Sequence, residues 1–123
     1  MARRREIAAR YDEALTDIDA LERPEVRDGV ESGWHLYVVR TRDSGRRKPL
    51  FERLRAQGLG VQVHYLPVYW HPYYAGLGYP RGLCPEAEKY YAGAISLPSF
   101  PAMGDDDVAR VVDVVRAGVR ALA

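Results

Sequence analysis

Residues 33–67, GWHLYVVRTRDSGRRKPLFERLRAQGLGVQVHYLP, predict a strand, a helix and a second strand in close succession. The run from Trp34 to Arg40 is rich in aromatic and β-branched residues, which favour strands. Pro49 is tolerated in a first helical turn, hydrophobic residues follow it at helical spacing, and Gly58 marks a helix end. Residues 59–67 alternate in polarity and stop at Pro67, so we expect the second strand there.

Helical patterns flank this stretch on both sides. Residues 3–21 carry apolar side chains at helical spacing, and residues 105–123 repeat valines in the same way after three aspartates. Between these helices, Pro85 opens a further helix and residues 95–101 form a short extended piece. The order of elements predicts an α+β domain with a short, mainly antiparallel sheet and helices on one face.

Length and composition limit the kinds of protein that this chain can be. Its 123 residues are one domain by size, large enough to bury a core. The 18 basic and 17 acidic residues give a net charge of +1, which argues against nucleic-acid binding. Cys84 is the only cysteine, so no internal disulfide forms and a reducing compartment is expected. No apolar run is long enough to span a membrane, and we expect a cytoplasmic protein without membrane contact.

Aromatic side chains concentrate in VQVHYLPVYWHPYYAGLGY, residues 61–79. Six of the thirteen aromatic residues of the chain lie in this segment, around two histidines and two prolines. Such a cluster indicates either a buried corner of the fold or one wall of a binding site.

His64 and Tyr65 are the strongest candidates for a binding function. Strand alternation places Val61 and Val63 on one face and Gln62 and His64 on the other, with Tyr65 where the strand gives way to a loop. Binding groups are often held at such a rim. The alternative is a histidine satisfied by a backbone carbonyl and a tyrosine packed in the core, and the sequence alone leaves both open.

Other candidate sites are weaker. We expect His71, which precedes Pro72, to be exposed in a loop, and His35 to be packed or hydrogen-bonded inside the first strand. The spacing from His64 to His71, with Cys84 far away, matches no usual zinc pattern. The sequence therefore predicts no metal site.

The chain offers no candidate for a catalytic residue. Ser96 and Ser99 lack the context of a nucleophile elbow, and no glycine-rich phosphate loop precedes a helix. Lys48 lies in an arginine-rich turn and Lys89 follows Glu88, and neither neighbourhood suggests the desolvated pocket that activates a lysine.

Three motifs taken together carry a family resemblance. The segments VQVHYLPVYWHPYY, LCPEAEKYYAGAISLP and PSFPAMGDDDVARVVDVV resemble, in order and spacing, the C-terminal domain of the DegT/DnrJ/EryC1/StrS aminotransferases. The opening RRREIAARYDEAL and the segment SGWHLYVVRT also fit, so the resemblance covers essentially all of residues 1–123. Members are fold-type I enzymes that use pyridoxal phosphate to aminate nucleotide-linked keto-sugars. The nearest branch makes UDP-4-amino-4,6-dideoxy-N-acetyl-β-L-altrosamine.

The resemblance implies roles for particular residues. Gln62, Val63, His64 and Tyr65 would lie against the nucleotide-sugar substrate, and the aromatic loop would help to close that side of the site. The lysine that holds the cofactor as a Schiff base belongs, in the family, to a large N-terminal domain that residues 1–123 do not contain. We therefore expect no cofactor binding by this chain alone. The implied partners are a separately encoded large domain and, in a complete enzyme, a second identical subunit.

Three hypotheses follow for function. The first is the C-terminal part of a nucleotide-sugar aminotransferase that aminates a UDP-4-keto-6-deoxy-sugar and is inactive alone. The second is a stand-alone binding module that kept the fold and lost the reaction. The third, a nucleic-acid binder using the basic clusters at residues 3–5 and 40–48, is the weakest because acidic residues follow each cluster.

Overall fold

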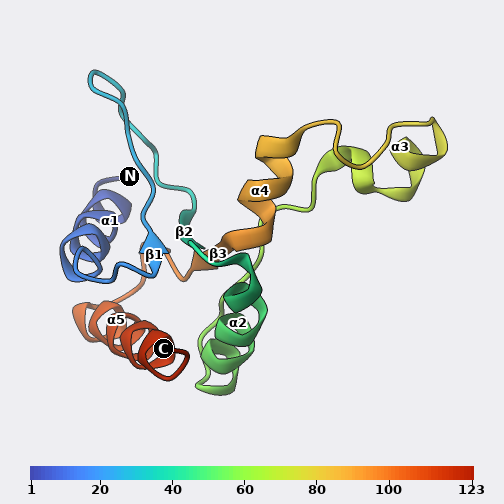
Figure 1. The fold of residues 1–123 in the computed structure, drawn as a ribbon. Coiled ribbons are helices and arrows are strands. Elements are labelled where there is room, and N and C mark those ends of the chain that lie inside the picture. Colours follow the sequence, from blue (N-terminus) through green and yellow to red (C-terminus); the bar gives the residue numbers. More distant parts are fainter.

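A computed structural model describes all of residues 1–123 and shows a three-stranded antiparallel sheet in the order β1-β2-β3 (Figure 1). Strand β2, Tyr37–Thr41, lies in the centre, between β1, Leu21–Glu22, and β3, Ala94–Leu97. Leu21 pairs with Thr41 on one side, and Val39 pairs with Ile95 on the other. The structure confirms the α+β class and the antiparallel sheet.

The fold contains five α-helices and two short 3-10 helices. Helices α1, α2 and α5 share the buried core with the sheet, α4 contacts β2, and α1 and α5 lie side by side (Figure 1). The bounds are α1, Ala2–Ala14; η1, Ser44–Arg46; α2, Arg47–Ala56; η2, Val68–Trp70; α3, Pro72–Gly76; α4, Pro85–Gly93; and α5, Asp105–Arg120.

The core lies between one face of the sheet and three helices. Alternation along β2 buries Tyr37 and Val39 on this face and leaves Val38 and Arg40 half-buried on the other. Helices α1, α2 and α5 cover the buried face with side chains at helical spacing, as the sequence predicts. Their fully or almost fully buried members are Ile7, Tyr11, Leu50, Leu54, Val108, Val111 and Val115.

Two elements differ from the sequence prediction. Helix α1 ends at Ala14 rather than near residue 21, because turn residues follow and Leu21 enters the sheet as a strand too short to show a periodicity. The strand predicted over residues 59–67 is wrong except at Gln62, which forms an isolated bridge with Ser96. Pairing beyond this bridge would reach Pro98, which has no N–H to donate, in one direction and the start of β3 in the other.

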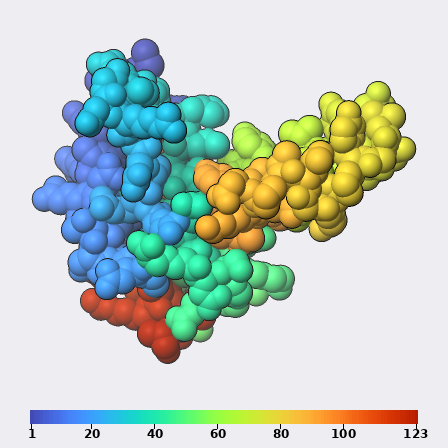
Figure 2. Space-filling view, turned by 45° about the horizontal axis from the view of Figure 1, so that its top comes forward, coloured from blue at the N-terminus to red at the C-terminus, as the bar shows by residue number.

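Residues 68–84, called here the aromatic arm, extend away from the body of the molecule (Figure 2). The arm was predicted as a loop and contains η2 and α3, connected by the extended residue His71. Most of its residues are exposed, including several large apolar side chains: Val68, Tyr73, Tyr74, Leu77, Tyr79 and Leu83. The arm is therefore a surface element and not a buried corner of the fold.

Candidate functional site

A groove beside β3 is lined by two of the four residues predicted to bind substrate, Gln62 and His64, whereas Val63 and Tyr65 are not part of its lining. The backbone N–H of Gln62 donates to the carbonyl of Ser96 at 3.2 Å, and the N–H of Ser96 donates to the carbonyl of Gln62 at 2.8 Å. Val61 is buried under this bridge and Gln62 is exposed, so the alternation predicted at the start of the segment is correct. The bridge fixes the chain immediately before His64.

His64 is half-buried, with its Nδ1 2.9 Å from the hydroxyl oxygen of Ser96. The Tyr65 ring lies beside it, with 4.6 Å between ring centroids, and the Tyr65 side chain is 66% exposed. The alternative of a purely structural histidine and tyrosine therefore does not describe the structure, because Tyr65 is not packed in the core and His64 contacts a hydroxyl rather than a backbone carbonyl. Nδ1 of His64 is thus hydrogen-bonded to Ser96, and the exposed phenol of Tyr65 lies next to the imidazole.

The groove has a volume of about 300 Å³ and is lined by side chains from three parts of the chain. His35 is one of them and is exposed two residues before β2, so the prediction that it lies inside a strand is wrong. Sequence reasoning assigned no binding role to His35 or Ser96, since their position beside His64 depends on a register that local patterns do not reveal. The complete lining is His35, Leu36, Gly60, Gln62, His64, Ser96, Leu97, Pro98, Ser99 and Phe100.

A carboxylate fastens the base of the aromatic arm. One oxygen of Glu88, in the first turn of α4, accepts hydrogen bonds from the Tyr69 hydroxyl, from the indole N–H of Trp70 at 3.2 Å and from the backbone N–H of Gly82. The Arg81 guanidinium lies 4.0 Å above the Trp70 ring. These donors, that of Tyr69 first, lower the pKa of Glu88 below its ordinary value.

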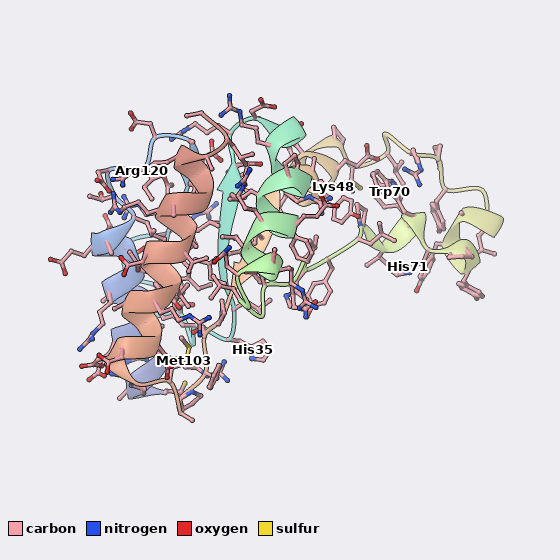
Figure 3. All side chains as sticks on the ribbon, turned by 90° about the horizontal axis from the view of Figure 1, so that it is seen from below. His35, Lys48, Trp70, His71, Met103 and Arg120 are labelled. Atoms are coloured by element: carbon pink, nitrogen blue, oxygen red, sulfur yellow. The ribbon has the colours of Figure 1, made fainter.

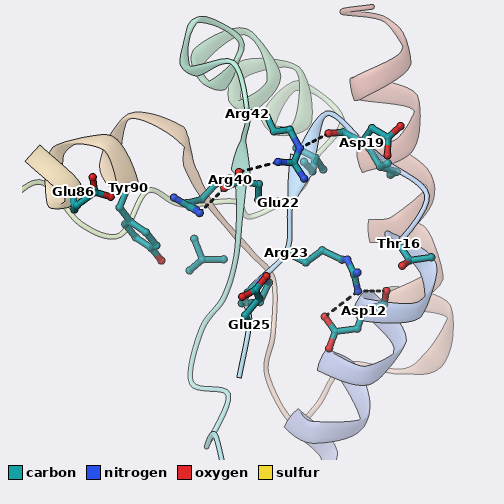
Figure 4. A pocket seen from close by; sticks show the side chains of 14 residues that line it. Asp12, Thr16, Asp19, Glu22, Arg23, Glu25, Arg40, Arg42, Glu86 and Tyr90 are labelled. Carbon is teal, nitrogen blue, oxygen red and sulfur yellow. Dashed lines mark hydrogen bonds and ion pairs between the residues drawn. The ribbon is translucent and has the colours of Figure 1, made fainter. Parts of the chain in front are cut away.

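The face of the sheet that points away from the core carries a larger cleft of about 910 Å³, dominated by charged side chains (Figure 4). Its arginines are already engaged: Glu22 pairs with Arg40 and with Arg42, and Arg23 donates to the backbone carbonyl of Asp12. Because these cations have partners within the chain, the cleft presents no free guanidinium to an anion.

Neither lysine lies in a site that fits a Schiff base. The Lys48 side chain is 77% exposed on α2 and pairs with Glu52 (Figure 3). Lys89 is exposed on α4. A lysine that forms an aldimine needs a desolvated surrounding or a cationic neighbour that lowers its pKa. The residues present therefore do not form the attachment site of pyridoxal phosphate.

The structure also offers no support for nucleic-acid binding, metal binding or a membrane-spanning helix. The basic cluster at the N-terminus is paired with acids, Arg3 with Glu6 and Asp105, and Arg5 with Glu31. No three side chains of the metal-binding types converge. No helix is long and apolar enough to cross a membrane.

Comparison with known proteins explains why these motifs occur together. The model of the DegT/DnrJ/EryC1/StrS aminotransferase family matches residues 1–116. The chain belongs to this family. The family depends on pyridoxal phosphate.

Proteins with similar sequences have names that refer to sugar or polysaccharide biosynthesis. The spore coat polysaccharide biosynthesis protein SpsC of Bacillus subtilis is 40% identical over 119 residues, which are 93% of this chain and 31% of SpsC. The dTDP-3-amino-3,4,6-trideoxy-alpha-D-glucose transaminase of Streptomyces venezuelae is 36% identical over 115 residues, 93% of this chain and 30% of that enzyme.

Solved structures show the same fold. The aminotransferase TlmJ of Streptoalloteichus hindustanus superimposes with a TM-score of 0.89 and 35% identity, over 99% of this chain and 32% of TlmJ. PseC of Helicobacter pylori, an aminotransferase involved in the biosynthesis of pseudoaminic acid, gives 0.88 and 26% identity over 98% of this chain and 33% of PseC. The chain thus spans about a third of the length of its relatives.

Proposed function

We propose that this chain is the C-terminal part of a pyridoxal-phosphate-dependent aminotransferase that aminates a nucleotide-linked 4-keto-6-deoxy sugar, with a UDP-sugar as the form favoured by the motifs. Its contribution is the substrate side of the site, through Gln62, Val63, His64 and Tyr65. The observation that supports this role is the groove: its lining includes the half-buried imidazole of His64, which contacts Ser96, and the exposed phenol of Tyr65 lies beside that imidazole. Such groups offer hydrogen bonds at their edges and apolar faces to a sugar or a base.

The chain is inactive alone in this proposal. The cofactor supplies the electron sink for transamination, and the protein must hold and orient it. Neither Lys48 nor Lys89 provides an attachment point. The missing functions belong to a large domain, in the same polypeptide or in a separate one, and the complete enzyme is a homodimer.

A stand-alone binding module is the second candidate. The exposed apolar side chains of the aromatic arm favour it, since a surface of this kind is typical of contacts with another protein. It predicts that the groove and the arm bind their ligands without any transaminase activity in any context.

A chimera separates these candidates. In the chimera, this chain replaces the matching third of the Streptomyces venezuelae transaminase. The chimera is loaded with pyridoxal phosphate and supplied with an amino donor and either a UDP-linked or a dTDP-linked keto-sugar. We expect amino-sugar formation with a preference for the UDP form, and none from the same enzyme lacking that third. A folded chimera that binds the cofactor but forms no amino-sugar would exclude the proposed role and support the module.

A further inference from the structure

We infer that the groove beside β3 is the subsite for the uncharged, hydroxyl-bearing part of the ligand, that Ser96 is the positioning residue of His64, and that His35 adds a hydrogen-bond donor. This assignment rests on the proposed function for the class of ligand. It goes further by excluding the diphosphate from the groove and by adding two residues to the site.

The charge of the lining carries the first step. None of the ten lining residues is Asp, Glu, Lys or Arg, although 28% of the residues in the chain are charged. Phosphates are usually recognised by guanidinium or ammonium groups or by helix N-termini. The nearby Arg4 is engaged with backbone, donating to the carbonyl of His35 at 2.9 Å. The groove therefore offers imidazole, amide and hydroxyl groups, and no ammonium or guanidinium group that would pair with a diphosphate.

Ser96 carries the second step, because its hydroxyl is fixed more firmly than a surface serine would be. The residue is 4% exposed, pairs with Val38 in the sheet, and exchanges two backbone hydrogen bonds with Gln62. Its hydroxyl lies 2.9 Å from Nδ1 of His64. With Nδ1 occupied, Nε2 is the nitrogen of His64 left for a ligand, and the ring orientation is set before the ligand arrives.

His35 carries the third step through its tautomer. Nη1 of Arg4 lies 3.2 Å from Nδ1 of His35. A guanidinium has only donors, so Nδ1 must accept and the proton of the neutral ring is on Nε2. His35 therefore adds an N–H donor to the lining, next to the amide of Gln62, which both donates and accepts.

The remaining lining is mainly apolar and suits the face of a sugar ring. Four of the six other lining residues, Leu36, Leu97, Pro98 and Phe100, are apolar, and Phe100 is half-exposed; Gly60 and Ser99 complete the groove. Neutral donors and acceptors beside apolar walls match a hydroxylated or amide-bearing ring better than a charged group.

NMR titration of the ¹⁵N-labelled chain tests the assignment with three probes: N-acetylglucosamine, UDP-N-acetylglucosamine and inorganic pyrophosphate. We expect the two sugars to shift the amide signals of Gln62, His64 and Leu97, and pyrophosphate to leave them in place. Ser96→Ala should weaken sugar binding about threefold to tenfold, the value of one neutral hydrogen bond. Ser96→Thr, which retains the hydroxyl, should restore most of the affinity.

A spectroscopic signature separates positioning from a merely structural role. In Ser96→Ala we expect the imidazole ¹⁵N signals of His64 to move toward those of a free ring, whereas the exposed control Ser44→Ala changes neither these signals nor the affinity. Pyrophosphate shifts equal to those of the sugars, unchanged affinity in Ser96→Ala, or amides unshifted by sugar at its solubility limit would each overturn the inference. If sugar leaves the amide signals of the groove unshifted and the chimera is active, this inference fails and the proposed function stands. If sugar shifts those signals and the chimera is inactive, the proposed function fails and this inference stands.

Discussion

Glu88 is the residue that holds the aromatic arm to the body, because a single carboxylate oxygen accepts hydrogen bonds from both ends of the arm. The ionised form accepts these bonds best, and so the pKa of Glu88 in the folded chain is lowered from its ordinary value of 4.5. The stabilisation of the arm is complete above the ordinary pKa and is lost as the pH falls through the lowered one.

We predict that the indole N–H signal of Trp70 is constant above pH 4.5 and shifts only at lower pH. Glu88→Gln should move this signal toward that of an exposed indole and speed amide exchange in residues 68–84 at neutral pH. NMR titration of both proteins measures this, with the Trp34 indole as an internal reference. A midpoint at or above the ordinary value would contradict the role of Glu88.

Thr41 permits a prediction about stability. Thr41 lies at the end of β2 and is 8% exposed, and its hydroxyl oxygen is buried without a hydrogen-bond partner. Thr41→Val keeps the size and removes the unpaired group, so we expect the free energy of unfolding to rise by about 1 kcal/mol. Urea denaturation of this variant and of Thr16→Val, an exposed control, measures the difference. A less stable Thr41→Val protein would show that the hydroxyl has a partner.

At the residue scale the sequence predicts part of the site. Alternation places Gln62 and His64 together on one face, and both line the groove in the structure, whereas Tyr65 lies exposed beside His64 and outside that lining. The sequence does not reveal that Ser96 holds His64, since the two are 32 positions apart and meet only through one isolated bridge. It does not reveal the tautomer of His35 either, because the partner Arg4 is 31 positions away and the two meet only in the fold.

At the scale of elements, the junction of α4 and β3 depends on a glycine. A Cβ atom on Gly93 would lie 2.8 Å from the backbone carbonyl oxygen of Thr41, closer than such contacts occur. Gly93 therefore allows α4 to run directly into β3 alongside the central strand.

We predict that Gly93→Ala lowers the free energy of unfolding by about 1–3 kcal/mol, because backbone rather than a flexible side chain must move. Gly76→Ala, in α3, is the matched control, since its Cβ would meet nothing within 4 Å and alanine favours a helix. Thermal unfolding monitored by circular dichroism compares the two. Equal stability of both variants would show that the junction relaxes without cost.

The strength of the local signal explains which elements the sequence predicts. Helix α5 begins at Asp105 as expected, because three aspartates precede a valine stripe whose members Val108, Val111 and Val115 are buried. Strand β1 has only two residues and no period to detect, so its place in the sheet comes from tertiary pairing alone. Residues 59–67 show the opposite error, an alternating pattern that forms only the single bridge between Gln62 and Ser96.

At the scale of the whole molecule, the chain has the fold of its family, and neither of its two lysines lies in a surrounding that fits a Schiff base. We predict that pyridoxal phosphate followed by borohydride leaves no specific, stoichiometric label on Lys48 or Lys89, because both side chains are exposed to water. Mass spectrometry of the digested protein measures the labelling. Stoichiometric modification of either lysine would show that the chain forms its own aldimine site.

The most direct test of the central claim is a comparison of KM and cofactor affinity in the active chimera for the unmodified groove, His64→Ala and Tyr65→Phe. We predict that each substitution raises KM for the nucleotide-sugar roughly threefold to tenfold, the range expected for one lost hydrogen bond to a neutral group, while the affinity for pyridoxal phosphate stays the same. The exposed control Thr16→Val should change neither value. Unchanged KM in both folded variants, or a loss of cofactor binding instead, would contradict the assignment of this groove to the substrate.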